Sequence, residues 1–473
     1  MEGRSLHLRQ AGKDQYAVGD RPIDVEEPIA VAEAVPEQRL PAAVSPRGFP
    51  DEVLIPPAKA DALERDRLLD PAWPKVICSL RTPDFRFFWC GNFLSNIGTW
   101  MQNIALSWLV LQLTNSSYWL GIVGFVAAIP YLLFTLFGGV IADRMNKRNL
   151  LITTQSAMAL LAFVMAALAY TKIITIRQVA ALSFLNGLAM AMNAPSYQAM
   201  VPRLVPMSDL PNAIALNSVQ FNLSRVIGPT LGGYAMAWAG VAGNFLLNGF
   251  SFMAVLFALV RMRYPAEIPH AHQGVWHSLV EGFRYVRRSR EMFALVALVA
   301  SASLLLFPFL TFVPYFVKNT LHSGERGLGF MMACSGIGAF VAAAIIAMRG
   351  HIRHRGPVIV FSGTFVMGAA IIFCYSHSFA LSAAMSWCEG FGLTMTSSLM
   401  NLALQQLTSD EMRGRVMSIY ATSFLGLPPL GCLLAGELSR HLPTSDAIAA
   451  MAAMALLSFI AFFAGSPALR HLD

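Results

Sequence analysis

The chain has 473 residues, of which 56% are hydrophobic and only 13% are charged, with a net charge of +7. Soluble globular proteins carry charge on about a quarter of their residues. This chain has too few charges to cover a water-facing surface, which excludes an ordinary soluble domain and indicates an integral membrane protein.

Residues 1–78 differ from the rest of the chain. They hold most of the acidic residues and many prolines, and they show no hydrophobic period. This composition predicts a disordered, acidic, proline-rich tail, because such a segment cannot bury enough apolar surface to fold. A regulatory or partner-binding tail is the alternative to an unstructured leader, and we favour the leader.

Apolar stretches of membrane-spanning length follow one another from Phe85 onward. They predict an all-α integral membrane fold with about twelve transmembrane helices, and no strand pattern interrupts them. The predicted spans are 86–112, 118–142, 149–170, 176–200, 212–238, 241–262, 292–318, 326–348, 357–375, 378–405, 412–438 and 445–466.

Loop charges predict the orientation. Arginine and lysine are frequent in every second loop and rare in the others, so the positive-inside rule places both termini in the cytoplasm. The longest internal loop, 263–291, divides the spans six and six. We therefore expect an N-terminal six-helix bundle at 79–262, a cytoplasmic linker at 263–291 and a C-terminal bundle at 292–473.

The two predicted bundles resemble each other weakly in sequence. At a shift of 203 positions Asn186 falls on Glu389, Gly187 on Gly390 and Gly233 on Gly436. Together with the six-plus-six division, these matches indicate a duplicated fold of the kind that transporters use.

The loop after the second span carries a polar motif. In "GGVIADRMNKRNLL" a glycine at a helix end precedes a carboxylate among cations. This arrangement fits either a conformational latch or a plain basic anchor. The residues of the predicted latch are Gly139, Asp143, Arg144, Lys147 and Arg148. The pattern resembles the signature loop of the major facilitator superfamily, although the usual glycine after the aspartate–arginine pair is absent. The counterpart loop, "RGHIRHRG", has no aspartate.

Glycines and a proline interrupt the fifth span. In "SRVIGPTLGGY" Ser224, Gly228 and Gly232 share one helix face, which allows close packing in lipid. Pro229 adds a kink that a neighbouring helix can accommodate. The run, completed by Gly233, resembles the fifth-span motif of major facilitator antiporters, which is associated with export.

Two charges fall near the middle of predicted spans. Arg225 is about halfway along the fifth and Glu389 lies inside the tenth. Charges at this depth are rare and indicate function, although an arginine satisfied by carbonyls and a permanently hydrogen-bonded acid remain alternatives. A carboxyl in a low-dielectric site takes up a proton more readily than one in water. We therefore interpret Glu389 and Arg225 as a proton-coupling pair.

Polar stripes follow three spans and predict a substrate cavity, with helix-to-helix hydrogen bonding as the alternative. The first span contributes Asn96, Thr99, Trp100 and Asn103, and the fourth contributes Asn186, Asn193 and Tyr197. Because the superfamily resemblance implies that spans one, four, seven and ten line the cavity, Phe307, Thr311 and Tyr315 of the seventh are added.

Other motifs are absent from the sequence. We find no nucleotide-binding loop and no hydrolase motif, and the six cysteines form no CxxC pair. The three histidines of "HAHQGVWH" suit a solvated basic loop better than a metal site. We expect no cofactor, no metal and no enzymatic activity.

Four stretches narrow the resemblance within the superfamily. They are "RTPDFRFFWCGNFLSNIGTWMQNIALSWLVLQLTNSS", "NAIALNSVQFNLSRVIGPTLGG", "EGFRYVRRS" and "DEMRGRVMSIY". They are similar to the branch that holds the enterobactin exporter and drug-efflux permeases. The resemblance implies export of a small amphiphilic molecule, a siderophore or a drug, by proton antiport with alternating access in the cell inner membrane.

The expected partners are the lipid bilayer, a small-molecule substrate and protons, with no nucleic acid and a monomeric chain. Three alternatives stay open. They are uptake or lipid flipping by the same fold, a non-transporting membrane sensor that uses the tail as its output, and a metal exporter that uses the loop histidines.

Overall fold

The computed structural model describes residues 75–262, 275–349, 354–466 and 470, without the side chains of 75, 135–144, 275–280 and 410. The tail predicted at 1–78 lies outside the described residues up to residue 74. Residues 53–473 form one compact unit, to which all of the following refers.

The described part of the chain is helical and contains no strand. After the short 3-10 helix η2 (Lys75–Arg81), the long helices of the first part of the chain are α2 (Pro83–Thr114), α3 (Ser117–Arg144), α4 (Lys147–Tyr170), α5 (Ile176–Met200) and α6 (Leu210–Arg261). After α7 (Val275–Arg288) follow α8 (Arg290–Leu305), α9 (Pro308–Asn319), α10 (Glu325–Arg349), α11 (Arg355–Tyr375), α12 (Phe379–Leu407), α13 (Asp410–Gly426), α14 (Pro428–His441) and α15 (Thr444–Gly465).

The predicted all-α membrane fold is confirmed. Eight segments of the described chain are long and apolar enough to cross a membrane. One of them, α6, has 52 residues and bends at Gly240, where φ is 68°, so it supplies two crossings. Helices α2, α5 and α12 also have spanning length, and they complete the twelve crossings.

Two predicted spans are each split into two helices. The seventh is broken between Leu305 and Pro308, and the eleventh between Gly426 and Pro428. Both second helices begin at a proline, which lacks the N–H that would continue the preceding helix and is preorganised for a first helical turn. Proline is thus the local reason for both breaks.

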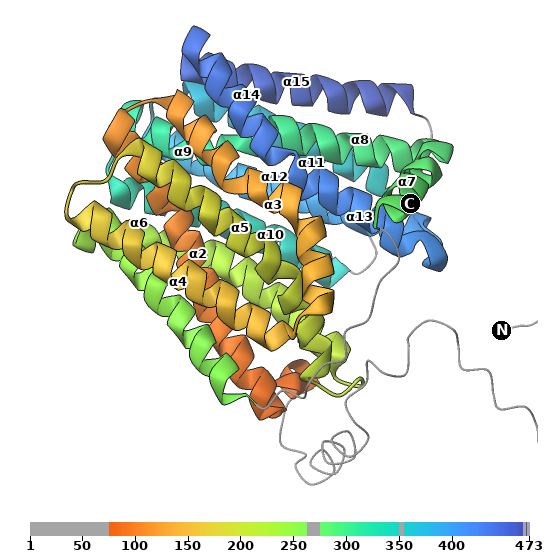
Figure 1. The fold of residues 1–473 in the computed structure, drawn as a ribbon. Coiled ribbons are helices and arrows are strands. Elements are labelled where there is room, and N and C mark those ends of the chain that lie inside the picture. Colours follow the sequence, from red (N-terminus) through yellow and green to blue (C-terminus); the bar gives the residue numbers. More distant parts are fainter. Residues whose placement is uncertain (1–74, 263–274, 350–353, 467–469, 471–473) are drawn as a thin grey trace, which may run out of the picture. The chain divides into compact units, whose positions relative to one another are not determined.

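The helices form two halves, which Figure 1 shows in sequence colours. In the N-half α2 and α4 pack on α6, and α3 packs on α5. In the C-half α10 and α11 pack on α12, while α15 packs on α11 and α8. The halves meet mainly where α6 contacts α10 and where α3 contacts α14.

Glycines show that the two halves repeat each other. A Cβ at Gly187 in α5 would overlap the carbonyl oxygen of Ala127 in α3, and one at Gly390 in α12 would overlap that of Ser335 in α10. Between the halves, Gly233 of α6 meets Gly329 of α10, and Gly436 of α14 meets Gly121 of α3. Equivalent helices are therefore in contact at equivalent glycines, as expected of a duplicated fold.

The segment between the halves contains α7, a helix within the stretch predicted as a linker. Its Glu281 pairs with Arg415 of α13 at 3.0 Å, and the Tyr285 and Ser409 hydroxyls lie 3.4 Å apart. Gly282 packs against the backbone of α13 at Arg415. Two of the four stretches that suggested the family branch, "EGFRYVRRS" and "DEMRGRVMSIY", are thus in contact, and α7 is attached to the C-half.

The packing of α10 on α12 predicts a cost for any side chain at Gly338, because a Cβ there would overlap the carbonyl oxygen of Trp387. We expect Gly338→Ala to destabilise the protein by about 1–3 kcal/mol, the usual range for overpacking. The measurement is the thermal unfolding midpoint of purified protein in detergent. Gly368→Ala in α11 is the control, since its Cβ would meet nothing within 4 Å. An equal midpoint in both variants would contradict this account of the contact.

Candidate functional site

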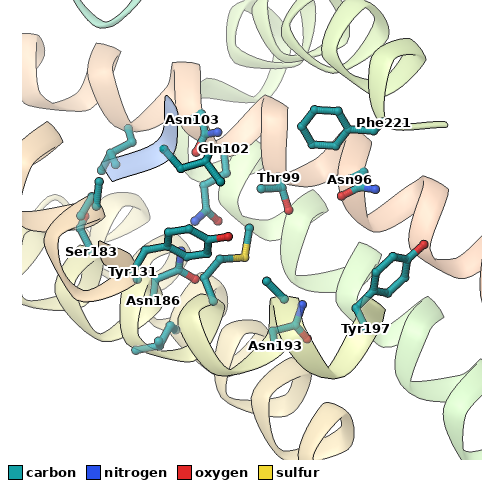
Figure 2. A pocket seen from close by; sticks show the side chains of 18 of the residues that line it. Asn96, Thr99, Gln102, Asn103, Tyr131, Ser183, Asn186, Asn193, Tyr197 and Phe221 are labelled. Atoms are coloured by element: carbon teal, nitrogen blue, oxygen red, sulfur yellow. The ribbon is translucent and has the colours of Figure 1, made fainter. Parts of the chain in front are cut away.

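A cavity of about 710 Å³ opens among α2, α3, α5 and α6 (Figure 2). Leu425 of α13 is its lining residue from the C-half. Polar positions recur every three or four residues along α2 and α5, so they fall on one face of each helix, and the fold turns both faces toward the cavity. Bare polar faces are tolerated in a membrane protein where they line such a space rather than lipid.

The structure brings six of the ten predicted cavity residues to this lining. They are Asn96, Thr99, Asn103, Asn186, Asn193 and Tyr197. Trp100 instead stands against Gly228 of α6 and meets Phe221 edge-on, with ring centroids 6.0 Å apart.

The residues expected from the seventh span lie elsewhere. Phe307 packs edge-on against Phe424 at 5.0 Å, Thr311 lies 3.6 Å from the Cys432 sulfur, and Tyr315 meets Phe316 at 5.9 Å. The polar lining of the cavity therefore comes from the N-half in this conformation.

Hydrogen bonds fix the direction of several cavity side chains. Thr154 and Gln155 of α4 both donate to the side-chain oxygen of Asn193 at 3.2 Å, which leaves the Asn193 amide group as a donor. Tyr197 donates to Asn217 at 3.1 Å. Gln102 accepts a bond from Asn248 at 2.7 Å, so its own amide group also remains a donor.

Acceptors stand beside these donors. The hydroxyl of Ser183, which is 4% exposed, and the side-chain oxygen of Asn186 are buried and make no hydrogen bond. The Thr99 hydroxyl donates to the Ser95 carbonyl at 2.9 Å and keeps its lone pairs. Buried polar groups without partners are uncommon, so Ser183 and Asn186 make this stretch of α5 a candidate for binding a molecule.

Sequence reasoning missed several residues of the lining. Gln102, Tyr131, Gln198, Asn217 and Phe221 all face the cavity. Gln102 follows Thr99 by three positions and Gln198 follows Asn193 by five, so the α2 stripe could have been extended. Tyr131 and Asn217 belong to helices with no such stripe, and only the packing of the helices reveals them.

A buried acid of the C-half and a half-buried arginine of the N-half lie near the contact between the halves, away from the cavity. Glu389 of α12 is 2% exposed and accepts a hydrogen bond from the Ser335 hydroxyl of α10 at 2.7 Å. The half-buried Arg225 of α6 interacts electrostatically with Glu389. The neighbour of Arg225, Val226, touches α10 at Gly336, where an added Cβ would lie 2.9 Å from the Val226 Cα. The pair thus forms at the contact of α6 with α10.

The glycines of the fifth-span motif face two directions. An added Cβ at Gly228 would lie 2.8 Å from the Ile97 carbonyl oxygen, and one at Gly232 would lie 3.1 Å from the Met101 Cα, so both face α2. Gly233 faces Gly329 in the other half. Pro229 is buried within α6. The motif therefore holds α6 between its own half and the opposite one.

The predicted latch is described only in part. α3 runs through Gly139, Asp143 and Arg144, whose side chains lie outside the described residues, and Lys147 begins α4. Arg148 donates to the Leu259 and Val260 carbonyls at 2.7 and 2.9 Å, at the last turn of α6. A cation at this place satisfies free carbonyls and the helix dipole.

The halves also meet at the end of the bundle where α2 finishes and α3 begins, here called the α2–α3 end. Trp108 donates to Glu325 at 3.0 Å, and Lys318 donates to the Leu111 carbonyl at 2.8 Å. Thr444 donates to Ser117 at 2.9 Å. The two glycine pairs between the halves lie near this end as well, so it is closed in this conformation.

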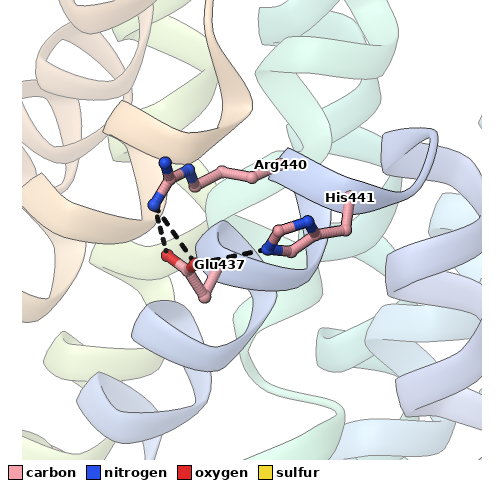
Figure 3. Close-up of polar contacts among 3 residues, drawn as sticks. All are labelled: Glu437, Arg440 and His441. Atoms are coloured by element: carbon pink, nitrogen blue, oxygen red, sulfur yellow. Dashed lines mark hydrogen bonds and ion pairs between the residues drawn. The ribbon is translucent and has the colours of Figure 1, made fainter.

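Glu437 lies at the same end, exposed at the last turn of α14. Figure 3 shows it between Arg440 and His441, whose nitrogens lie 3.2 and 3.6 Å from its carboxylate. Glu437 therefore belongs to a surface ion pair in the last turn of α14, whereas Glu389 is buried. Within the described residues no group of three or more histidine, cysteine or acidic side chains could hold a metal ion.

Comparison with known proteins agrees with this architecture. The family described as "Transmembrane secretion effector" matches residues 75–471. A staphyloferrin A transporter of Staphylococcus aureus is 25% identical over 74% of this chain and 88% of its own length. The enterobactin exporter EntS of Shigella flexneri is 23% identical over 80% and 91%. The multidrug efflux pump Tap of Mycolicibacterium fortuitum is 25% identical over 72% and 86%.

Solved structures share the fold. A bacterial homologue of the human lysosomal transporter Spinster, in an inward-facing and unoccupied conformation, aligns with a TM-score of 0.63 and 13% identity over 82% of this chain and 97% of that one. The nucleoside transporter NupG aligns with a TM-score of 0.62 and 14% identity over 80% and 98%.

The described helices make twelve crossings in two repeated halves around a cavity, and with the family match and the relatives they define a multi-pass membrane transporter rather than an enzyme. The chain belongs to the transmembrane secretion effector family of the major facilitator superfamily. The resemblance stated from the sequence is thereby confirmed.

Closure of the α2–α3 end predicts that a side chain at Gly233 separates the halves there, because its Cβ would overlap the Gly329 Cα. A contact present in one conformation only shifts the population toward the other when it is removed. We expect Gly233→Val to lengthen the distance between spin labels at Lys172 and His377, measured by pulsed electron resonance. Lys172 and His377 are exposed and lie in loops of the two halves at this end. The six native cysteines are replaced by alanine so that only these two positions carry a label.

Gly368→Val is the control for this experiment, since an added Cβ at that glycine would meet nothing within 4 Å. An unchanged distance distribution in a folded Gly233→Val protein would show that the glycine contact does not keep this end closed.

Proposed function

We propose that the protein exports a small amphiphilic molecule, a siderophore or a drug-like compound, by proton antiport with alternating access. The observation that carries this proposal is the Arg225–Glu389 pair, a buried acid of one half that interacts with a cation of the other. The functions of the relatives, siderophore transport and drug efflux, support the direction and the substrate class.

The pair gives a physical route to coupling. While Glu389 is ionised, its attraction to Arg225 favours the conformation in which α6 and α10 are together. A proton on Glu389 removes one charge and with it most of that attraction. Leaving a single unpaired charge in a buried site is strongly unfavourable, so the empty, deprotonated carrier is held in place. Either a proton or the binding energy of a substrate is then needed before the halves move.

Substrate would bind in the cavity of the N-half, and the two halves would rock about it. The proposed latch, formed by Gly139, Asp143, Arg144, Lys147 and Arg148, would stabilise the outward-facing state at the opposite end from the closed α2–α3 end. Because loops rich in arginine and lysine remain in the cytoplasm, both termini would be cytoplasmic, with the protein in the inner membrane. We propose a monomer as the transporting unit, with domain limits at 79–262, 263–291 and 292–473.

The central test uses inverted membrane vesicles that are energised to an acidic interior and contain a pH-sensitive dye. Addition of a transported siderophore or drug should release protons and restore the fluorescence in wild type. Glu389→Gln should reduce this response to that of vesicles without the protein, because an amide cannot carry a proton. The matched control is Glu437→Gln, which removes an exposed acid of the same type and should respond as wild type.

Two outcomes would contradict the proposal in different ways. Equal responses of wild type and Glu389→Gln would remove Glu389 from the coupling mechanism. Substrate accumulation in the vesicles without proton release would retain export and exclude antiport.

A further inference from the structure

The lining of the cavity combines apolar side chains with uncharged polar ones. None of the described residues that line it carries a charge, and its polar groups are amides and hydroxyls. A charged molecule that leaves water for such a site loses hydration that neutral dipoles replace only in part, whereas a neutral molecule loses far less. A cavity of this composition therefore selects against net charge.

The internal repeat sharpens this observation. Asn186 and Glu389 occupy equivalent positions of α5 and α12, at the shift that also relates Gly187 to Gly390. Asn186 lines the cavity with its side-chain oxygen unpaired, whereas Glu389 is turned to Ser335 at the contact of helices. The acidic equivalent is thus held outside the cavity, and the neutral one faces it.

The unpaired groups also define what the bound molecule must offer. Ser183 and Asn186 have unpaired oxygens buried at the wall of the cavity, and the amide groups of Asn193 and Gln102 are oriented by Gln155 and Asn248. A site built to hydrogen-bond specific groups discriminates strongly against molecules that lack them, because its buried polar groups then remain unpaired.

We propose that the cavity recognises its substrate as an uncharged molecule, through a patch formed by Ser183, Asn186 and Asn193 of α5 with Thr99 and Gln102 of α2. The patch accepts hydrogen bonds from hydroxyl or amide donors of the substrate and donates to its carbonyl or ether oxygens. Carboxylates and ammonium groups of the substrate are neutralised or absent when it binds. This inference names the substrate class of the proposed exporter and rests on that proposed function.

The experiment measures which small reagents reach Ser183, so no substrate needs to be known. Ser183→Cys is prepared with the six native cysteines replaced by alanine, and the purified protein is treated with three methanethiosulfonates. One carries a neutral 2-hydroxyethyl group, one an anionic sulfonatoethyl group and one a cationic trimethylammonium-ethyl group. Each thiolate attack forms a mixed disulfide and releases methanesulfinate, and mass spectrometry gives the rate.

The reference is a cysteine at the exposed Lys172, which corrects for the intrinsic reactivity of each reagent. We expect both charged reagents to lose at least about tenfold in rate relative to the neutral one at position 183, equivalent to about 1.4 kcal/mol. Thr99→Cys, on the α2 side of the patch, should also react faster with the neutral reagent than with the charged ones. It replaces Ser183→Cys in the experiment if that variant does not fold. Equal relative rates at the cavity and at position 172 would overturn the proposal.

Two further variants separate the patch from simple exclusion of charge. Asn186→Asp should make the cationic reagent react faster than the anionic one at position 183. In the vesicle assay, Ser183→Ala should weaken transport, whereas Ser303→Ala should not, although both serines are buried with unpaired hydroxyls. An equal effect of both serine variants would contradict the patch.

Failure of the inference differs from failure of export. Reagent access is measured on purified protein without any gradient, so it does not depend on transport. Charge exclusion without substrate movement would contradict export and leave the cavity assignment standing. Export of permanently charged compounds would contradict the proposed selection against charge and leave the export function standing.

Discussion

The arrangement of the two halves depends on helix backbones that approach closely at glycine. Gly121 meets Gly436 and Gly233 meets Gly329, each pair with one glycine in each half. In lipid no hydrophobic force drives helices together, so such contacts hold by van der Waals packing. Because this packing is lost as soon as the backbones separate, the contact between the halves depends on their close approach at these glycines. Polar contacts such as Trp108 with Glu325 add to it at the same end.

Much of the fold could be predicted from the sequence, because membrane spans appear as runs of apolar residues and the thickness of the bilayer sets the length of each run. The limits of α5 and α11 differ from the predicted spans by at most two residues at either end, and α6 bends at Gly240, between the predicted spans five and six. The breaks at Pro308 and Pro428 were also encoded locally. They were missed because apolar runs continue through them, and hydropathy does not record the loss of one backbone N–H.

The site was less predictable, because a stripe of polar residues shows which face of a helix avoids lipid but not what that face meets. Asn96, Thr99 and Asn103 face the cavity, whereas Trp100, adjacent in sequence to Thr99, packs on Gly228. The contribution of Tyr131 and Asn217 arises only from the docking of α3 and α6 around the same space. Likewise α7 was hidden in a basic loop, since its contacts with Arg415 and Ser409 join segments far apart in the chain.

The repeat explains how one duplicated scaffold holds two different kinds of polar group. A buried charge needs a fixed partner, because its desolvation is repaid only by a close opposite charge and hydrogen bonds. Glu389 has Ser335 and Arg225 around it, and the second of these belongs to the other half. Asn186, at the equivalent position, needs no such partner and can remain open to a cavity. A charge at the contact of the halves responds to their movement, whereas a neutral group in the cavity responds to what is bound there. In the proposed mechanism, the same position of the repeat senses protons in one half and recognises the substrate in the other.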